Sequence, residues 1–391
     1  MKQLNCYVDK VYYLEMIEIW VFTSPGCAQI AVIDIQTACL IDYTQWYPGS
    51  PDLLGNLYNG RVLKKLTAIG GSFIDIHHDL AGFLPDNAGG KLLQEGDYAR
   101  VKVTRSAQAG KGVRLIHQNV DGYNEYETQK TVCLLKKGIS PFEEIANRYA
   151  HASIYLKELS LLKIIPSYLH SRICLKNISS IDPILEQIET LSSNIIHLPL
   201  GMKASIINTP ALVAIDIDSA DQSKEKENKA TAQVRNNRTI LPVLLRQLIL
   251  RNISGAILID LAGIPSKKRK LLQNDFIELL KLDPLRPKFA GFSHLGFAEI
   301  TRPRLRPSLD ELAHSPHGLA IKILNALEKK INDNPSRYHW SPGTLCLSLK
   351  LYNALIKDTW AITHFEQRNS LKLSLSTDPS FSLEQWSYHH G

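Results

Sequence analysis

The chain has 391 residues, of which 44% are hydrophobic and 21% charged, which is typical of an ordinary soluble globular protein with two or three domains. The 45 Lys and Arg exceed the 38 Asp and Glu to give a net charge of +7, a mild excess that permits a polyanionic partner without requiring one. No apolar run reaches the roughly 20 residues of a membrane span. The first residues lack a basic segment followed by an apolar one, so a secretory signal is not expected. The six cysteines form no CxxC pair, which argues against a disulfide framework or a zinc ribbon and favours a cytoplasmic location.

Three strand-like runs open the ordered part of the sequence. They occupy 18–22, 28–33 and 38–42, and the turn residues between them predict a meander. Residues 1–15 show no comparable pattern and are interpreted as a dispensable extension or an upstream start. From 55 to 116, four or five short strand-like runs are broken by glycines, which predicts a small barrel.

The next segment, to about residue 170, is less regular. Ser140 and Glu143 have the spacing of a capping box and predict the start of a helix. A strand at 172–175 and a helix from Asp182 follow. The apolar residues of that helix fall on one face: Ile184, Leu185, Ile188 and Leu191.

Two apolar runs that each end in aspartate stand out further along the chain. They are residues 211–216, which end in Asp216, and 255–260, which end in Asp260. A polar loop at 221–237 and a predicted helix at 237–251 lie between them. Such a strand–helix–strand unit makes the two strands parallel and near neighbours, so both carboxylates should meet at one edge of the sheet.

This pair of carboxylates allows two interpretations. A single Asp at the end of a strand most often caps the following turn or helix. Two of them on adjacent parallel strands could instead hold a hard divalent cation, with Asp218, two residues on and facing the same way, as a third oxygen ligand.

Other groups of residues are equally open on the sequence alone. Phe73 and Phe83 are either core residues of the barrel or exposed rings that stack unpaired bases. Basic side chains close to them in the sequence suit a nucleic-acid backbone: Lys102, Arg105, Lys111 and Arg114. The basic run 267–270 is either a solvated helix start or a phosphate contact. His314 and His317 supply two metal ligands at most, whereas a closed zinc site requires four.

The C-terminal part is expected to form a smaller unit of helices and strands. One helix carries an apolar stripe, and a strand is expected at 371–375. The stripe consists of Leu319, Ile323, Leu327 and Ile331.

Several motifs occur together in one order. The barrel contributes Gly55-Asn-Leu-Tyr-Asn-Gly-Arg-Val, Ser72-Phe-Ile-Asp-Ile and Ala81-Gly-Phe-Leu-Pro. The later part contributes Ala211-Leu-Val-Ala-Ile-Asp-Ile-Asp-Ser and Gly296-Phe-Ala-Glu-Ile-Thr-Arg-Pro-Arg-Leu. In this order and spacing they resemble the ribonuclease E/G family, over most of residues 16–391.

The resemblance implies an α/β and α+β multidomain fold. Its expected parts are a split RNase H-like subdomain (16–54 and 172–205), an inserted OB-fold RNA-binding barrel (55–117), a reduced 5′-sensor-like region (118–171), a DNase I-like catalytic subdomain (206–312) and a small C-terminal α+β domain (318–391).

The resemblance also implies a function and a site. The family consists of Mg²⁺-dependent endoribonucleases that cut single-stranded RNA, so the expected activity is hydrolysis of A/U-rich RNA to 5′-phosphate products in RNA processing or decay. Asp216 and Asp260 match the magnesium-binding aspartates, and Asn237 and Arg286 match residues near the active centre. The expected RNA-binding residues of the barrel are Phe73, Phe83, Lys111 and Arg114.

The chain departs from the family pattern at several positions. Asp218 stands where the family usually has Asn, Gly263 stands where it has a second Asp, and the loop at 224–228 lacks the usual glycine pair. His314 and His317 occupy the place of the zinc-binding cysteines that link protomers, and the pair that senses a 5′-monophosphate is missing. A zinc-linked assembly is therefore not expected, while a homodimer of another kind remains open.

Two other functions remain as alternatives. One is an RNA-binding relative of the same family that no longer cleaves, which Asp218 and the glycine-free loop favour. The other is a nucleotide- or phosphate-binding α/β enzyme that uses the same strand edge. No glycine-rich phosphate loop follows any strand, which counts against this second alternative.

Overall fold

The computed structural model describes residues 17–77, 80–118, 130–175, 182–218, 229–333 and 342–390. It divides the chain into two compact units, one of residues 51–144 with 304–307 and the other of residues 1–50, 145–303 and 308–391. The predictions made for residues 1–15 and for the loop at 224–228 lie outside the described residues. In the part of the chain that is described, no helix is long and apolar enough to cross a membrane.

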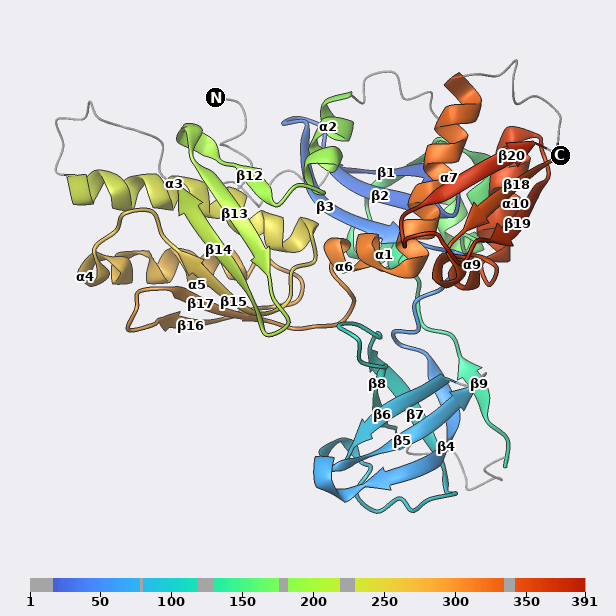
Figure 1. The fold of residues 1–391 in the computed structure, drawn as a ribbon. Helices are drawn as coiled ribbons and strands as arrows, with labels where there is room; N and C mark the ends of the chain where they lie inside the picture. The colour runs from blue at the N-terminus through green and yellow to red at the C-terminus, as the bar shows by residue number, and fades with distance from the viewer. Residues whose placement is uncertain are drawn as a thin grey trace. The chain divides into compact units, whose positions relative to one another are not determined.

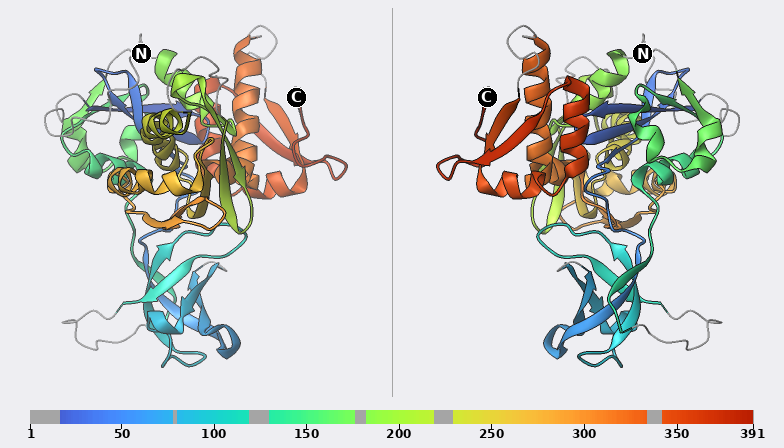
Figure 2. Two further views of the ribbon diagram at one scale, coloured as in Figure 1. Left: turned by 90° about the vertical axis from the view of Figure 1, so that its left-hand side faces the viewer. Right: turned by 90° about the vertical axis from the view of Figure 1, so that its right-hand side faces the viewer.

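The smaller unit is a closed barrel of five strands, with a sixth strand added outside the closure (Figures 1 and 2). Its strands are β4 (Leu57–Leu66), β5 (Gly71–His77), β6 (Leu80–Pro85), β7 (Tyr98–Arg105), β8 (Arg114–His117) and β9 (Cys133–Lys136), with 3₁₀ turns η3 (Thr67–Ile69) and η4 (Asp86–Ala88). The barrel closes because β4 pairs with both β5 and β7, while β9 adds to β4. This confirms the predicted OB-like barrel.

Side chains from alternate positions along the strands fill the interior of the barrel. Ile74, Val101 and Leu115 point inward and are fully buried, whereas their chain neighbours are half-buried or exposed. Gly60 lies where β4 crosses Ile74, and a Cβ there would come within 2.5 Å of the Ile74 side chain. Only glycine allows the two strands to approach this closely.

The predicted N-terminal meander is confirmed as part of a five-stranded sheet. It comprises β1 (Ile17–Ser24), β2 (Cys27–Asp34) and β3 (Cys39–Trp46), and its full order is β11-β10-β1-β2-β3. Parallel strands β10 (Ser153–Leu156) and β11 (Ile173–Leu175) extend it beyond β1. The 3₁₀ turns η5 (Leu159–Lys163) and η6 (Ser167–Arg172) connect them, and α2 (Asp182–Thr190) follows.

Helix α1 (Pro141–Arg148) begins at the predicted capping box. The Ser140 hydroxyl accepts a hydrogen bond from the Glu143 amide at 3.1 Å, and the Glu143 carboxylate accepts one from the Ser140 amide at 2.9 Å. Because these two bonds satisfy amides that a helix leaves open, they fix where α1 starts.

A six-stranded mixed sheet carries both aspartates. Its order is β12 (Ile195–His197), β13 (Lys203–Asn208), β14 (Leu212–Asp218), β15 (Gly255–Asp260), β17 (Ala298–Arg302) and β16 (Lys288–Phe292). Strands β14 and β15 are parallel neighbours, as predicted. The helices of this part are α3 (Lys229–Leu250), α4 (Ser266–Arg269) and α5 (Gln273–Leu280), with η7 (Pro199–Gly201) and η8 (Lys270–Leu272).

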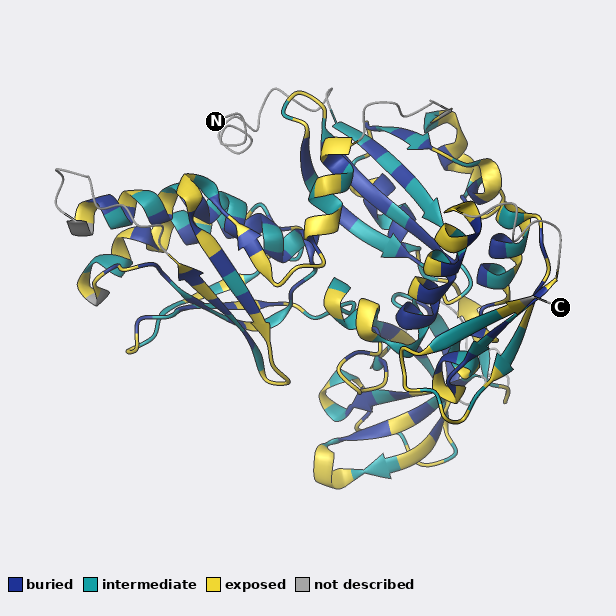
Figure 3. Ribbon diagram, turned by 45° about the horizontal axis from the view of Figure 1, so that its top comes forward, coloured by how far each residue is buried: buried dark blue, intermediate teal, exposed yellow. Residues whose placement is uncertain are grey.

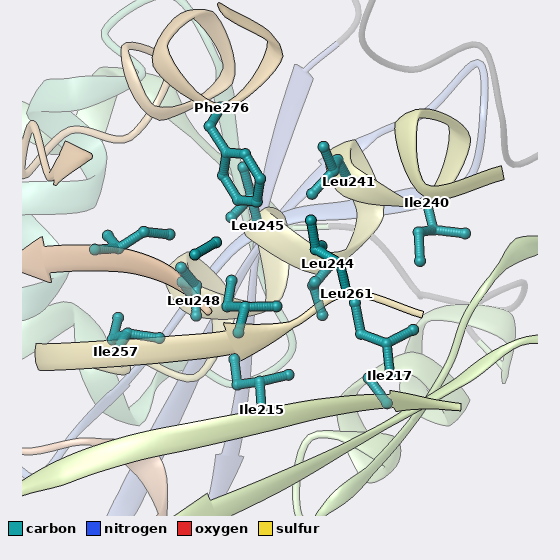
Figure 4. Close-up of a cluster of buried hydrophobic side chains, with 14 of the residues drawn as sticks. Ile215, Ile217, Ile240, Leu241, Leu244, Leu245, Leu248, Ile257, Leu261 and Phe276 are labelled. Carbon is teal, nitrogen blue, oxygen red and sulfur yellow. The ribbon is translucent and has the colours of Figure 1, made fainter. Parts of the chain in front are cut away.

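Helix α3 covers one face of this sheet (Figure 4). Its Leu241, Leu244 and Leu248 pack in one buried cluster with Ile215 of β14 and Ile257 of β15. The helix is longer than the predicted 237–251 and includes Lys229, since its first turns also bury Ala232 and Val234. The opposite face of β14 carries half-buried and exposed residues (Figure 3).

Two boundaries differ from those expected from the sequence. β10 lies within the region expected to be a separate 5′-sensor-like segment, yet it pairs with β1. β12 and β13 lie largely within the expected RNase H-like range, yet they pair toward β14. All three strands pair with residues far away or across a hairpin, and such pairing leaves no periodic signal in a run of three to six residues.

The C-terminal part consists of a three-stranded sheet and helices, as expected. Its elements are α6 (Leu309–His314), α7 (Pro316–Asp333), β18 (Gly343–Leu347), α9 (Leu349–Leu355), α10 (Thr359–Asn369), β19 (Leu373–Thr377) and β20 (Trp386–His390), with sheet order β19-β18-β20. The predicted stripe on α7 is buried against this sheet.

Candidate active site

The two aspartates lie side by side on adjacent parallel strands. Asp216 of β14 and Asp260, the last residue of β15, are direct partners in the strand register. Neighbouring strands are about 4.8 Å apart, so the backbone positions that carry the two carboxylates lie close together. The predicted meeting of these side chains at one sheet edge is therefore observed.

Both carboxylates point to the face of the sheet that α3 does not cover. Ile215 and Ile217, on either side of Asp216, are buried against α3, and alternation along the strand turns Asp216 and Asp218 the other way. Asp216 and Asp218 are exposed and Asp260 is half-buried. The site is thus open to an incoming ligand.

The neighbouring strand adds a hydroxyl and a cation to this face. Ser205 of β13 is the register partner of Asp216, and Lys203 is the partner of Asp218. Directly opposite residues of an antiparallel pair have Cβ atoms within about 5.5 Å, so the Lys203 ammonium can reach the Asp218 carboxylate. Asp218, the third carboxylate, therefore has a positively charged residue opposite it on the neighbouring strand.

Asp260 has a positive partner that the sequence prediction missed. Arg269, at the end of α4, places its Nη1 atom 3.3 Å from the Asp260 carboxylate. The same guanidinium donates to the carbonyl of Ile264 at 2.9 Å and to the carbonyl of Gly296. Arg269 therefore joins the loop that follows Asp260 to the turn between β16 and β17. The only sequence signal for it was the basic run at 267–270.

Asn237 lies behind the site and is buried. Its side-chain amide donates to the carbonyls of Gln233 at 2.8 Å and Ala262 at 3.0 Å. The second bond ties α3 to the turn that follows Asp260. Its Oδ1 atom is buried and has no hydrogen-bond partner among the described residues.

Gly263 explains one departure from the family pattern. Its φ of +62° lies in the left-handed region, and a Cβ there would come within 2.3 Å of the Gln233 side chain. An aspartate at this position would be strained, and the end of the flexible Gln233 side chain would have to move. The family pattern has Asp here, and the backbone conformation accounts for glycine in this chain.

The structure does not bring Arg286 to the aspartates. Arg286 precedes β16, whose Lys288 pairs with Thr301, which in turn pairs with Ala256 of β15. Ala256 is four residues before Asp260, or about 13 Å along the strand. Arg286 lies at the opposite end of the sheet, where it donates to the Lys281 carbonyl at 2.5 Å. Its role at the site stays a prediction from the resemblance alone.

A buried ion pair organises that opposite end. Arg302 donates to Asp283 at 2.6 Å, and both side chains are at most 4% exposed. Arg302 also donates to the Asn252 side chain and to the Ile253 carbonyl. Arg302 and Asp283 therefore have a structural task, which is to join the end of α3, α5 and β17.

The donor set fits a hard divalent cation. No group of three or more His, Cys, Asp or Glu side chains gathers around one point in the ranges that the structure describes. Mg²⁺ in proteins, however, is usually held by one or two carboxylates, with water and substrate phosphates completing the shell. Asp216 and Asp260 supply such a pair.

His314 and His317 of the C-terminal part each contact an acidic side chain. His317 pairs with the buried Asp358 at 2.7 Å, whereas His314 pairs with Asp310 at 3.2 Å. The two rings thus have separate partners.

The barrel gathers three of the four predicted RNA-binding residues. Phe73 of β5 and Phe83 of β6 are register partners, and their rings meet edge-to-face with centroids 5.7 Å apart. Arg114 of β8 is the strand partner of Phe83. Phe73 is 38% exposed, so at least part of its ring can stack a base. Lys111 is exposed in the turn between β7 and β8.

Residues 143–305 match the ribonuclease E/G family. Over 168 residues the chain is 30% identical to ribonuclease E of Escherichia coli (strain K12), covering 39% of this chain and 16% of that protein. Over 217 residues it is 26% identical to ribonuclease E of Haemophilus influenzae, covering 51% and 23% respectively.

A third relative matches a shorter segment at higher identity. Ribonuclease E of Synechocystis sp. is 35% identical over 122 residues, or 31% of this chain and 18% of that protein. The matched part therefore spans less than a quarter of the length of each of these three curated relatives. All three are distant relatives.

Proposed function

The chain is a member of the ribonuclease E/G family, and from that premise we propose that it is a Mg²⁺-dependent endoribonuclease. Its substrate would be single-stranded, A/U-rich RNA, hydrolysed internally to 5′-phosphate products during RNA processing or decay in the cytoplasm. The observation that carries the proposal is the pair Asp216 and Asp260, in register on adjacent parallel strands and turned to the uncovered face of the sheet.

In this proposal the aspartates hold the metal ion. When bound, Mg²⁺ supplies a Lewis acid that polarises a phosphoryl oxygen and lowers the pKa of an attacking water. Arg269 keeps the Asp260 carboxylate in place and balances its charge. Asn237 acts behind the site by fixing the turn after Asp260 through Ala262.

The barrel would hold the RNA chain. Phe73 and Phe83 offer two ring surfaces for unpaired bases, which explains a preference for single strands, because bases in a duplex are already stacked. Lys111 and Arg114 supply positive charge for the backbone. We propose no zinc-linked assembly, and a homodimer of another kind remains an expectation.

One observation favours a second function, that of an RNA-binding relative that cleaves weakly. Asp260 is already engaged by Arg269, and a metal ion would have to share or replace this partner. Lys203 is the register partner of Asp218 on β13, so a second positively charged residue lies near the site. If these cations keep metal out, the barrel would still bind RNA while the sheet edge stayed inactive.

The two functions separate in a cleavage assay. The purified protein is incubated with a 5′-labelled, single-stranded A/U-rich RNA in Mg²⁺ and, in parallel, in EDTA. We expect internal cleavage in Mg²⁺ only, with products that a 5′-monophosphate-dependent exonuclease degrades. RNA that stays intact in Mg²⁺ but binds the protein would establish the second function instead.

A further inference from the structure

A row of aromatic and basic side chains crosses four strands of the barrel. Phe73 is the register partner of Phe83, and Phe83 is the partner of Arg114. Arg114 is in turn the partner of Arg105 on β7. Two positive charges directly opposite each other repel, so this pairing costs stability unless an anion joins it.

A third arginine enters the same place from a distant part of the sequence. The segment 304–307 belongs to the barrel unit. The Ser106 amide donates to the Leu305 carbonyl at 2.8 Å, which seats this segment beside the end of β7. Arg306 is anchored by ion pairs to Asp52 and Glu144. Arg304 directly precedes Leu305 and Arg105 directly precedes Ser106, so the two arginines lie close to each other.

The three arginines share one electrostatic environment. Burial lowers the pKa of Arg105, and the positive charges of Arg114 and Arg304 lower it further. None of the three forms an ion pair with an acidic side chain in the described ranges. The Nε–H of Arg105 is buried and has no acceptor among the described residues. Within the described ranges, no acidic side chain balances the positive charge of these three arginines.

We propose that Arg105, Arg114 and Arg304 form a clamp for one backbone phosphate of single-stranded RNA, beside the base that stacks on Phe83. The clamp rests on the proposed function, because it assigns the path of that same RNA. Guanidinium groups suit a phosphodiester since their N–H donors match its two free oxygens. A phosphate would accept from the unpaired Arg105 Nε–H and relieve the repulsion among the three cations.

The clamp also gives Arg304 a specific purpose. Arg302, two residues earlier, is buried in the other unit with Asp283, while Arg306, two residues later, is paired inside the barrel unit. Arg304 is the one of these three arginines with no acidic partner in the described part of the chain. Arg304 thus lies between two arginines whose charges are paired within the protein. Its own charge is explained if its partner is a phosphate of the RNA.

The test uses equilibrium binding without cleavage. Fluorescence anisotropy measures the affinity of the full chain for a labelled single-stranded A/U-rich RNA in EDTA, at several salt concentrations. Arg304→Gln should bind about tenfold more weakly, as expected for one charged hydrogen-bonded contact, and its log–log salt slope should fall by about 0.7. Arg304→Lys keeps the charge and should restore the slope.

A matched control and a stability measurement exclude a structural cause. Arg61→Gln removes an exposed barrel arginine that lies over the Tyr98 ring, outside the clamp, and should change the affinity less than about twofold. The melting temperature of Arg304→Gln should stay equal to or above that of the unmodified protein, because the substitution relieves repulsion. A lowered melting temperature together with weaker binding would overturn the clamp in favour of a structural role.

The remaining outcomes distinguish the clamp from the proposed function. If the unmodified protein binds RNA and Arg304→Gln binds it with the same affinity and salt slope, the clamp is wrong and the proposed function stands. If the unmodified protein binds no RNA under these conditions, both are wrong.

Discussion

The ion pair between Arg269 and Asp260 makes a quantitative prediction about Mg²⁺. Any cation that binds Asp260 competes with the Arg269 guanidinium, which lies 3.3 Å from the carboxylate. Arg269→Gln removes the competing charge and keeps a side chain that can donate to the Ile264 carbonyl. The variant should therefore bind Mg²⁺ more tightly than the unmodified protein does.

The size of the effect follows from the exposure of the pair. The Asp260 side chain is 45% exposed and the Arg269 side chain 13% exposed, so solvent screens the pair. Ion pairs of this kind contribute about 0.2–1 kcal/mol, which corresponds to about 1.4- to 5-fold in an equilibrium constant. The Mg²⁺ concentration for half-maximal cleavage should fall by that factor.

The assay is a Mg²⁺ titration of single-turnover cleavage, accompanied by calorimetric Mg²⁺ binding and a thermal melt. Arg269→Lys, which keeps the charge, is the control and should retain the unmodified Mg²⁺ dependence within about twofold. The reasoning is refuted if a folded Arg269→Gln needs more Mg²⁺ than the unmodified protein, or fails to cleave at saturating Mg²⁺. A higher Mg²⁺ requirement would mean that Arg269 mainly positions Asp260 for the metal ion, and loss of cleavage at saturating Mg²⁺ would mean that Arg269 contacts the substrate.

Three further predictions concern the framework of the site, the barrel and pH. Asp283→Asn leaves the buried Arg302 charge unpaired and should lower the free energy of unfolding by about 3–5 kcal/mol in urea denaturation. A loss below about 1 kcal/mol, as expected for the half-buried control Asp275→Asn, would contradict it. Phe73→Ala should weaken RNA binding by about 5- to 150-fold, from the roughly 1–3 kcal/mol of one stacked base, with the highly exposed Leu92→Ala as control; unchanged affinity would refute stacking. Burial alone would raise the pKa of Glu158, but hydrogen bonds from His364, Thr23 and Arg368 outweigh it and lower the pKa from 4.5 to about 2. Since the folded pKa is the lower one, the ionised carboxylate stabilises the fold above about pH 4.5, and this contribution is lost as the pH falls toward 2. Melting curves of the unmodified protein and Glu158→Gln should converge over that interval, and a constant difference would speak against it.

Local patterns in the sequence were enough to predict the core of the candidate site. The two apolar runs ending in Asp216 and Asp260 specify buried strands, and the segment between them allows only a crossover that makes the strands parallel. The register then follows from packing, because Ile215 and Ile257 must both face α3. A shift by one residue would have buried Asp216.

Positions that depend on distant pairing were not predictable in this way. Arg286 is close in sequence to other motif residues, but its distance from Asp260 depends on how β16 and β17 are paired with β15. Arg269 lies in a basic run whose members look alike in sequence, and only the fold shows which one turns toward Asp260. Arg304 reaches Arg105 only because the chain returns to the barrel after β17.

The central claim is that Asp216 and Asp260 together form the metal-binding centre of a nuclease. The most direct measurement is the single-turnover cleavage rate of Asp216→Asn and Asp260→Asn at saturating Mg²⁺, with RNA affinity measured alongside and Asp275→Asn as control. Both site variants should lose at least about 100-fold in rate, as for the removal of one group that stabilises transition-state charge, while RNA affinity and the control stay unchanged. If Asp216→Asn and Asp260→Asn still cleaved RNA at the rate of the unmodified protein, the two aspartates would not form the metal-binding centre.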